Sequence, residues 1–172
     1  MSEVRAMLSN ERGLTLAEIL VAVAIIGVGL VGLAVVVPVS SYGVQEGNQV
    51  TTATFLAEQM IERARAAAWT GVPAIDCLGV GTASAPVPTG GQCTGAPSPT
   101  ATQFPDEANV SGYTQYARIV RVQDCSTGGG CAGVVSNTLR RVTVTVTYRP
   151  LTASGVSPSN KTVTLEWLVT QK

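Results

Sequence analysis

One uncharged stretch near the amino end limits what this chain can fold into more than any other feature. Residues Leu14 to Val37 form a largely apolar run of 24 positions, and its only charge is Glu18. About 20 such residues suffice to cross a bilayer as a helix. A carboxylate inside hydrocarbon costs about 2.5–3.5 kcal/mol on insertion scales. The sequence therefore predicts a membrane helix with one acidic residue near its start, and that residue requires an explanation.

A polar leader ends at Gly13, Leu14 follows, and Glu18 lies four residues later. The residues around this junction of leader and apolar run resemble the class III signal of type IV pilins and pseudopilins. In that family a prepilin peptidase cuts after the glycine and methylates the new amino terminus, and the apolar segment is retained as the assembly domain. The resemblance implies cleavage between Gly13 and Leu14, N-methylation of Leu14 and a role for Glu18 in assembly.

Glu18 has a physical reason to act in assembly. After cleavage Leu14 carries a free α-amino group, which is mostly protonated at neutral pH. Glu18 lies within reach of that amine or of a neighbouring subunit's amine. Because an unpaired buried carboxylate is costly, such pairing favours one axial stagger between subunits. The alternative is an interfacial glutamate without a role.

The membrane segment also contains residues that weaken a helix. Ile26–Leu33 is similar to the glycine-punctuated stretch of PilV-type minor pilins, and Phe55–Arg63 to the helix that follows in them. Glycine costs a helix about 1 kcal/mol relative to alanine, and proline removes a backbone donor. We expect a weakened region that unwinds during assembly, with a kink or local break at Pro38; close helix packing is the structural alternative. The helix-weakening residues are Gly27, Gly29, Gly32 and Pro38.

The remaining sequence predicts a globular domain over residues 38–172, after a leader (1–13) and a membrane helix (14–37). Its expected parts are a helix over 38–69, a loop over 70–112 and a sheet over 113–170. The loop contains six prolines, and the helix has an apolar stripe at the three- and four-residue spacing of one face. The stripe consists of Ala53, Leu56, Ala57, Met60, Ile61, Ala64, Ala67 and Ala68.

Three segments alternate as strands do: Tyr113–Gln123, Leu139–Tyr148 and Lys161–Thr170. The middle one is the clearest, because valines occupy one face and threonines the other. In meander order these strands are antiparallel and place one apolar face on the helix. The predicted fold class is α+β, a long N-terminal helix packed on a small antiparallel sheet, as the resemblance to pilins also implies.

Four cysteines follow the apolar run, and an even number in an exported domain favours disulfides. Of the three possible connectivities we favour Cys77–Cys93 and Cys125–Cys131, because each closes a short loop rich in small or turn-forming residues. A four-cysteine zinc site is the rival interpretation, but the close cysteine pairs that such sites use are absent.

The composition argues against catalysis. The chain has no histidine, and 11 basic residues balance 11 acidic ones. Most hydrolase triads and zinc centres need histidine, so no enzyme, cofactor or metal is expected.

Asp106 and Glu107 are interpreted as solvated loop acids, and Arg140 and Arg141 as residues that border a sheet edge. A nucleic-acid surface needs basic and aromatic side chains that converge; the candidates are Arg118, Arg121, Arg140, Arg141, Tyr113 and Tyr116.

The resemblance implies a PilV-like minor type IV pilin that initiates assembly, modifies the fibre or contributes to adhesion. Its expected partners are prepilin peptidase, other major and minor pilins, the inner-membrane assembly platform and membrane lipid; nucleic acid is not expected.

Arg5 and Arg12 precede the apolar run and no basic residue follows until Arg63, which keeps the amino end cytoplasmic. The chain would cross the bacterial inner membrane once, with a periplasmic domain, and then enter a pilus or pseudopilus at the cell surface. The alternatives are a minor pseudopilin of a type II secretion system and a periplasmic domain on a simple anchor.

Overall fold

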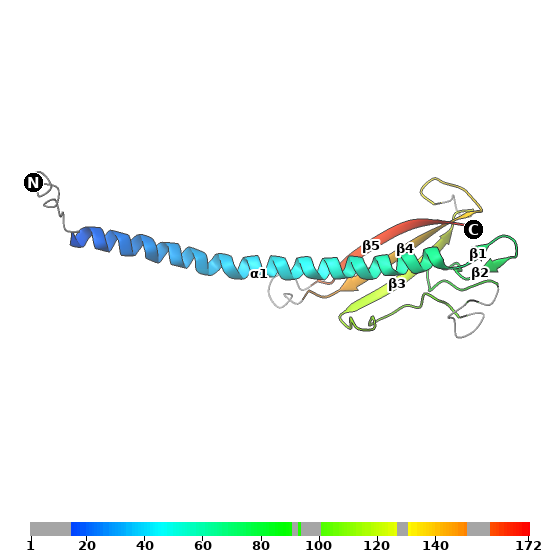
Figure 1. Ribbon diagram of the computed structural model, residues 1–172, viewed down its shortest axis with the longest axis horizontal. Coiled ribbons are helices and arrows are strands. Elements are labelled where there is room, and N and C mark those ends of the chain that lie inside the picture. Colours follow the sequence, from blue (N-terminus) through cyan, green and yellow to red (C-terminus); the bar gives the residue numbers. More distant parts are fainter. Residues whose placement is uncertain (1–14, 91–92, 94–100, 127–130, 151–158) are drawn as a thin grey trace, which may run out of the picture. The chain divides into compact units, whose positions relative to one another are not determined.

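The computed structural model describes residues 15–90, 93, 101–126, 131–150 and 159–172. The chain divides into two compact units, Met1–Val44 and Gln45–Lys172. A single helix, α1 (Leu16–Ala66), supplies the described part of the first unit and the beginning of the second (Figure 1). The leader, and with it the Gly13–Leu14 junction, lies outside the described residues.

The second unit contains a three-stranded antiparallel sheet. Its strands are β3 (Tyr116–Asp124), β4 (Leu139–Tyr148) and β5 (Lys161–Thr170), in the order β3-β4-β5. The expected meander is confirmed, and β4 and β5 have the predicted bounds. The first strand starts three residues later than expected, because Tyr113 lies in a turn closed by a hydrogen bond from its amide to the Val110 carbonyl, 2.8 Å.

The part of α1 from Gln45 to Ala66 runs along one face of this sheet (Figure 1). Buried valines of β3 and β4 alternate with outward threonines or polar residues, and they meet the predicted helix stripe in one hydrophobic core. Ala68 is the exception: α1 ends at Ala66, so Ala68 lies beyond the helix and is exposed. The fold class predicted from the sequence is confirmed.

The described parts of the segment from 70 to 112 contain more regular structure than the expected loop; residues 91–92 and 94–100 lie outside the described residues. A short antiparallel pair joins β1 (Trp69–Thr70) to β2 (Ile75–Asp76). Further along, Gly81 pairs with Val122 and Glu107 pairs with Arg118, so two pieces of this segment extend the β3 edge of the sheet. Buried backbone groups need hydrogen-bond partners, and here those partners lie far away in the sequence.

A buried ion pair anchors the segment to the sheet. The Arg140 guanidinium donates to the Asp76 carboxylate over 2.6 Å and lies 4.3 Å from the centre of the Trp69 ring. Arg140 is 8% exposed and β4 is the central strand, so the expectation that Arg140 and Arg141 border a sheet edge is wrong. Burial alone would raise the pKa of Asp76, but hydrogen bonds from Arg140, Thr89 and the Gly79 amide outweigh it and lower that pKa.

We predict that Asp76→Asn destabilises the globular unit and that the loss depends on pH. Breaking a buried pair typically costs about 3–5 kcal/mol, because the remaining charge loses its partner. A carboxylate with a lowered pKa stabilises the fold above its unfolded pKa of about 3.9, and this contribution disappears as pH falls through the lower, folded value. Urea unfolding of residues 45–172 should therefore show a large difference at pH 7 that shrinks below about pH 4.

The matched control is Asp106→Asn, which breaks the more exposed pair with Arg121. Exposed pairs are worth about 0–1 kcal/mol, so this variant should lose little stability at pH 7. An equal loss from Asp76→Asn at neutral and acidic pH would contradict the assignment of the lowered pKa.

Candidate functional site

The first turn of α1 is closed by Thr15. The Glu18 amide donates to the Thr15 carbonyl over 3.0 Å and to the Thr15 hydroxyl over 3.3 Å. Thr15 and Glu18 thus stand at the two positions of a capping box, in which a threonine precedes a glutamate by three residues. The sequence contains this signal, but Thr15 is not among the site residues predicted from it. A carboxylate in the first turn also interacts favourably with the helix dipole.

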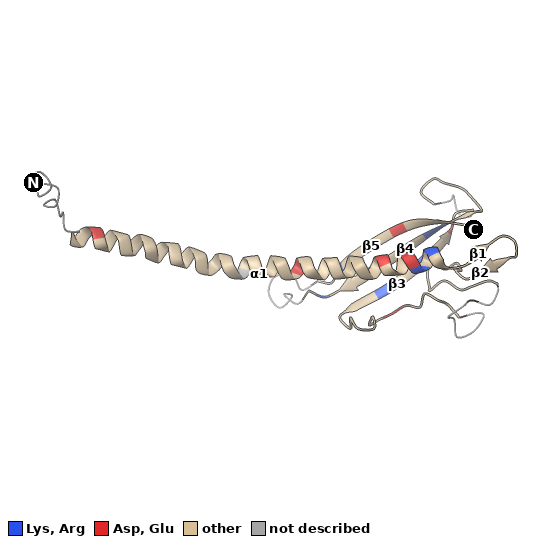
Figure 2. Ribbon diagram, viewed as in Figure 1, with Lys and Arg blue, Asp and Glu red and all other residues tan. Residues whose placement is uncertain are grey.

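The helix that follows is uncovered along its apolar part. Every large apolar side chain from Leu16 to Val44 is exposed, from 46% at Tyr42 to 77% at Leu16. Figure 2 shows no charged residue on α1 between Glu18 and Glu46. Leu16–Ala66 is the one helix among the described residues that is long and apolar enough to cross a membrane. Such a surface is unfavourable in water by about 25 cal/mol per Å² of apolar area, so it requires lipid or other helices around it.

The helix-weakening residues lie inside an unbroken helix. Gly27, Gly29 and Gly32 are helical, and a Cβ atom added at any of them would meet nothing within 4 Å. Pro38 is also within α1, so the local break expected there is absent. Because no neighbouring side chain in the described residues demands glycine, the effect of these residues is confined to the helix itself. They lower its propensity without improving any contact in this state.

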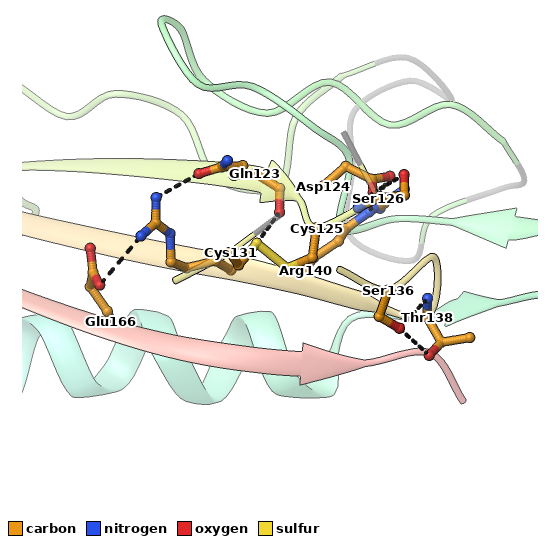
Figure 3. The surroundings of a disulfide bond; sticks show 10 residues. Gln123, Asp124, Cys125, Ser126, Cys131, Ser136, Thr138, Arg140 and Glu166 are labelled. Carbon is orange, nitrogen blue, oxygen red and sulfur yellow. Dashed lines mark hydrogen bonds and ion pairs between the residues drawn. A yellow bond between two sulfur atoms is a disulfide. The ribbon is translucent and has the colours of Figure 1, made fainter. Parts of the chain in front are cut away.

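Both cysteine pairs are disulfide-bonded as the sequence analysis favours. Cys77 is joined to Cys93 and Cys125 to Cys131, with Cα–Cα distances of 5.4 and 4.9 Å. The second bond lies beyond the end of β3, where Ser126 donates to Asp124 and Cys125 donates to the Leu139 carbonyl (Figure 3). With no free cysteine, none of the four can act as the thiolate ligand that a zinc site needs.

The basic side chains considered for nucleic acid do not converge into a free patch. Arg118 is 3% exposed and paired with Glu107, and Arg140 is paired with Asp76. Tyr116 is buried in the core, where its ring has no open face for a base to stack on. These three candidates are therefore too buried to form part of a stacking and phosphate-binding surface.

The two loop acids are also more constrained than expected. Asp106 accepts two hydrogen bonds from Arg121, at 2.6 and 2.9 Å, which lower its pKa. Glu107 accepts from the buried Arg118 over 2.7 Å. The interpretation as a solvated acid is wrong for Glu107, which is partly buried against Arg118. Asp106 is exposed as expected, but it is also the partner of an arginine on β3. The adjacency of the two acids in a loop gave no information about their contacts with β3.

A comparison with known protein families identifies the segment in which α1 begins. Residues 8–34 match the family described as the prokaryotic N-terminal methylation motif. No curated protein matches the chain, and no solved structure matches it. The matched segment contains Thr15, Glu18, Gly27, Gly29 and Gly32.

The motif and the fold together define a class. A methylation motif of the type IV prepilin kind, on a long apolar helix that continues into an α+β domain, supports a type IV pilin or pseudopilin. It points to a structural subunit that is anchored in a membrane, processed by prepilin peptidase and assembled with other pilins.

We predict that the two disulfides stabilise the globular unit by different amounts. In the chain-entropy model, loops of 16 and 6 residues correspond to about 3 and about 2 kcal/mol. The double variant Cys77→Ala/Cys93→Ala should therefore lose more stability than Cys125→Ala/Cys131→Ala, measured by urea unfolding. Non-reducing peptide mapping of the exported protein should show both bonds. Free thiols or the crossed connectivities would contradict the structure.

Proposed function

We propose that this chain is a minor type IV pilin, similar to the PilV type. It is inserted in the inner membrane with its globular unit in the periplasm, processed by prepilin peptidase and incorporated into a pilus. Its role there is to initiate assembly, to modify the fibre or to contribute to adhesion. The observation that carries the proposal is the methylation motif over residues 8–34, which lies on the start of an exposed apolar helix.

In this proposal the uncovered part of α1 exchanges lipid for neighbouring subunits. The apolar surface from Leu16 to Val44 is satisfied by the bilayer before assembly and by other pilin helices afterwards. Helix association in such an environment depends on close packing and polar contacts rather than on a hydrophobic gain. The large side chains fill the interface, and Gly27, Gly29 and Gly32 allow α1 to unwind locally or to pack closely against a neighbour.

Glu18 sets the position of the subunit within the fibre. Its side chain is exposed, and it has no ion pair among the described residues. The proposed partner is the methylated amine of Leu14 on an adjacent subunit, since methylation leaves the positive charge intact. A buried carboxylate that must find one cation restricts the axial stagger of the two helices, as buried polar groups fix register in other helical assemblies.

A minor pseudopilin of a type II secretion system would have the same motif and the same helix. The inner-membrane assembly platform differs between the two systems, so co-purification of one platform or the other separates them. A globular domain on a simple anchor is the other alternative, and it needs neither cleavage at Gly13 nor a charge at Glu18.

The first prediction from this proposal concerns processing. The mature chain should begin at Leu14 with a methylated amine, as read from the amino-terminal mass of the protein in its host membrane. Gly13→Asp should leave an uncleaved, membrane-bound precursor, because the peptidase cuts after glycine. Retention of Met1 in the wild type, or a cut beyond Pro38, would refute the proposal.

The second prediction concerns Glu18. Glu18→Gln preserves the size of the side chain but removes its charge, so it should lower incorporation into fibres without affecting cleavage or the melting of residues 39–172. The measurement is the ratio of this subunit in sheared fibres to that in membranes. The loss should be large, because a neighbour's buried amine would lose its partner, an effect of about 3–5 kcal/mol in other buried pairs.

The control for helix capping is Thr15→Ala, which removes the hydroxyl bonded to the Glu18 amide. If Glu18 acts only by stabilising the first turn, Thr15→Ala should reproduce the assembly defect. A subunit at the fibre tip has no subunit above it, so Glu18→Gln could be incorporated normally there. Counting copies distinguishes the outcomes: a single copy indicates a tip position, whereas many copies with normal incorporation contradict charge pairing.

A further inference from the structure

The two edges of the three-stranded sheet differ. Along the outer edge of β3, Gly81 and Val122 exchange two backbone hydrogen bonds, and Glu107 and Arg118 exchange two more, all at 2.8–2.9 Å. Along β5 no described segment forms such bonds from Lys161 to Thr170. The single contact at that edge lies past the strand, where Lys172 donates to the Trp69 carbonyl over 2.9 Å. Among the described residues, one edge is therefore covered and the other is open for the length of a strand.

The hydrogen-bond pattern shows which groups face outward. In an antiparallel pair, alternate residues of each strand bond to the partner. Gln171 donates to the Thr138 carbonyl on the β4 side, and Lys172 bonds on the opposite side. The even-numbered residues of β5 consequently direct their amides and carbonyls away from β4. These outward positions are Thr162, Thr164, Glu166, Leu168 and Thr170.

Apolar side chains border this edge on the helix side. Trp167 is on the core-facing side of β5, opposite Val142 of β4, yet it is 49% exposed because α1 covers β5 incompletely. A groove of about 450 Å³ remains between α1 and β5, lined by Ile61, Leu165 and Trp167 together with charged residues. Val163 and Leu165 pack only partly against the core. The edge therefore has both unpaired backbone groups and uncovered apolar side chains, the two features used in strand addition.

The charges around the groove are mostly acidic. Its lining contains Glu58, Glu62, Glu166 and one cation, Arg65. Arg65 is committed to Glu62 at 2.7 Å and lies 5.3 Å from the Trp167 ring centre. Glu58 has no ion pair among the described residues. Glu166 directs its carboxylate to the face of the sheet away from α1, where it accepts from the Thr143 hydroxyl over 3.3 Å and reaches Arg141 at 3.9 Å. Each face of this edge thus has a carboxylate that a cationic partner can contact.

We propose that β5 and this groove form a docking site for an extended segment of another protein, with alternating apolar side chains and lysine or arginine between them. The segment adds to the sheet as a further strand through the outward backbone groups of β5. One set of its side chains contacts Trp167 and Leu165 on the helix side of the sheet. Its cations alternate with these side chains and therefore lie on the opposite face, near Glu166. This site is separate from the α1 surface that the proposed function uses.

A second copy of this chain is a poorer occupant. Two β5 strands paired edge to edge would bring together two copies of the same acidic groove, and like charges across a strand pair are destabilising. Charged residues at a free edge are a common way for proteins to suppress self-pairing. The acidic residues therefore select against the homodimer and in favour of a basic segment.

The test uses the full chain in detergent micelles and three capped nonapeptides. One alternates valine with lysine, the second alternates valine with glutamate, and the third is the valine–lysine peptide with alternate backbone amides N-methylated. Fluorescence anisotropy should show saturable binding of the first peptide below about 1 mM, and binding at least about tenfold weaker for the other two. The loss on N-methylation would show that the backbone groups of the peptide are used.

The matched variants are Thr164→Pro and Thr164→Ala. Proline removes only an amide that points away from β4, and proline is tolerated on edge strands, so the variant should keep its fold by circular dichroism but lose the peptide. Alanine keeps that amide and should bind as the wild type does. Glu166→Lys should weaken the valine–lysine peptide about tenfold and strengthen the valine–glutamate one, because the charged side chains of each peptide lie on the face of Glu166.

Four results would each overturn the proposal. They are no saturation by the valine–lysine peptide, equal binding of its N-methylated form, unchanged binding by folded Thr164→Pro, and a dimer of the chain alone that Thr164→Pro dissociates. The last result would assign the edge to self-pairing. A Thr164→Pro variant that fails to fold leaves the N-methylated peptide and Glu166→Lys as the deciding measurements.

Discussion

The arrangement of the globular unit depends on one buried charge. Arg118 lies on β3 beneath α1, 3% exposed, and donates to Glu107 in the long connection and to the Leu56 carbonyl and Gln59 side chain of the helix. Two residues earlier on the same strand, the Tyr116 hydroxyl donates to the Gln49 carbonyl over 3.3 Å. Two side chains of one strand thus hold two carbonyls of one helix. Apolar contacts alone permit a helix to slide along a sheet, whereas hydrogen bonds that must all be satisfied permit one axial position.

This constraint matters because alanines make up half of the buried stripe of α1. Ala53, Ala57 and Ala64 alternate there with Leu56, Met60 and Ile61. Such a face brings the helix close to the sheet but buries little apolar area per turn. The polar clusters around Arg118 and Arg140, together with the two disulfides, add the specificity that a small core supplies poorly. The connection between Gly71 and Gly112 is bonded to both clusters, through Glu107 and Asp76, and these bonds attach it to the sheet.

The sequence predicted what depends on local pattern. The valine–threonine alternation of β4 gave its bounds and its buried face, the spacing of Ala53 to Ala67 gave the helix stripe, and the two short loops favoured the disulfide pairs. It did not reveal the burial of Arg118 and Arg140 or the partners of Asp106 and Glu107, because each depends on a residue elsewhere in the chain. The strands β1 and β2 pair with each other locally, but with two residues each they are too short to show an alternation. Thr15 is different: its role as helix cap follows from a local threonine–glutamate spacing.

The molecule leaves two kinds of surface unsatisfied, and they differ in physical character. The apolar part of α1 exposes side chains whose backbone groups are all bonded within the helix, so it can enter lipid or a bundle of helices. The β5 edge exposes backbone groups that need hydrogen-bond partners, so it can be satisfied by water or by another strand but not by lipid. Its acidic border strengthens that distinction, since Glu58 and Glu166 are costly to place in hydrocarbon. The two surfaces therefore need different partners. Association through the apolar part of α1 does not pair the outward backbone groups of β5.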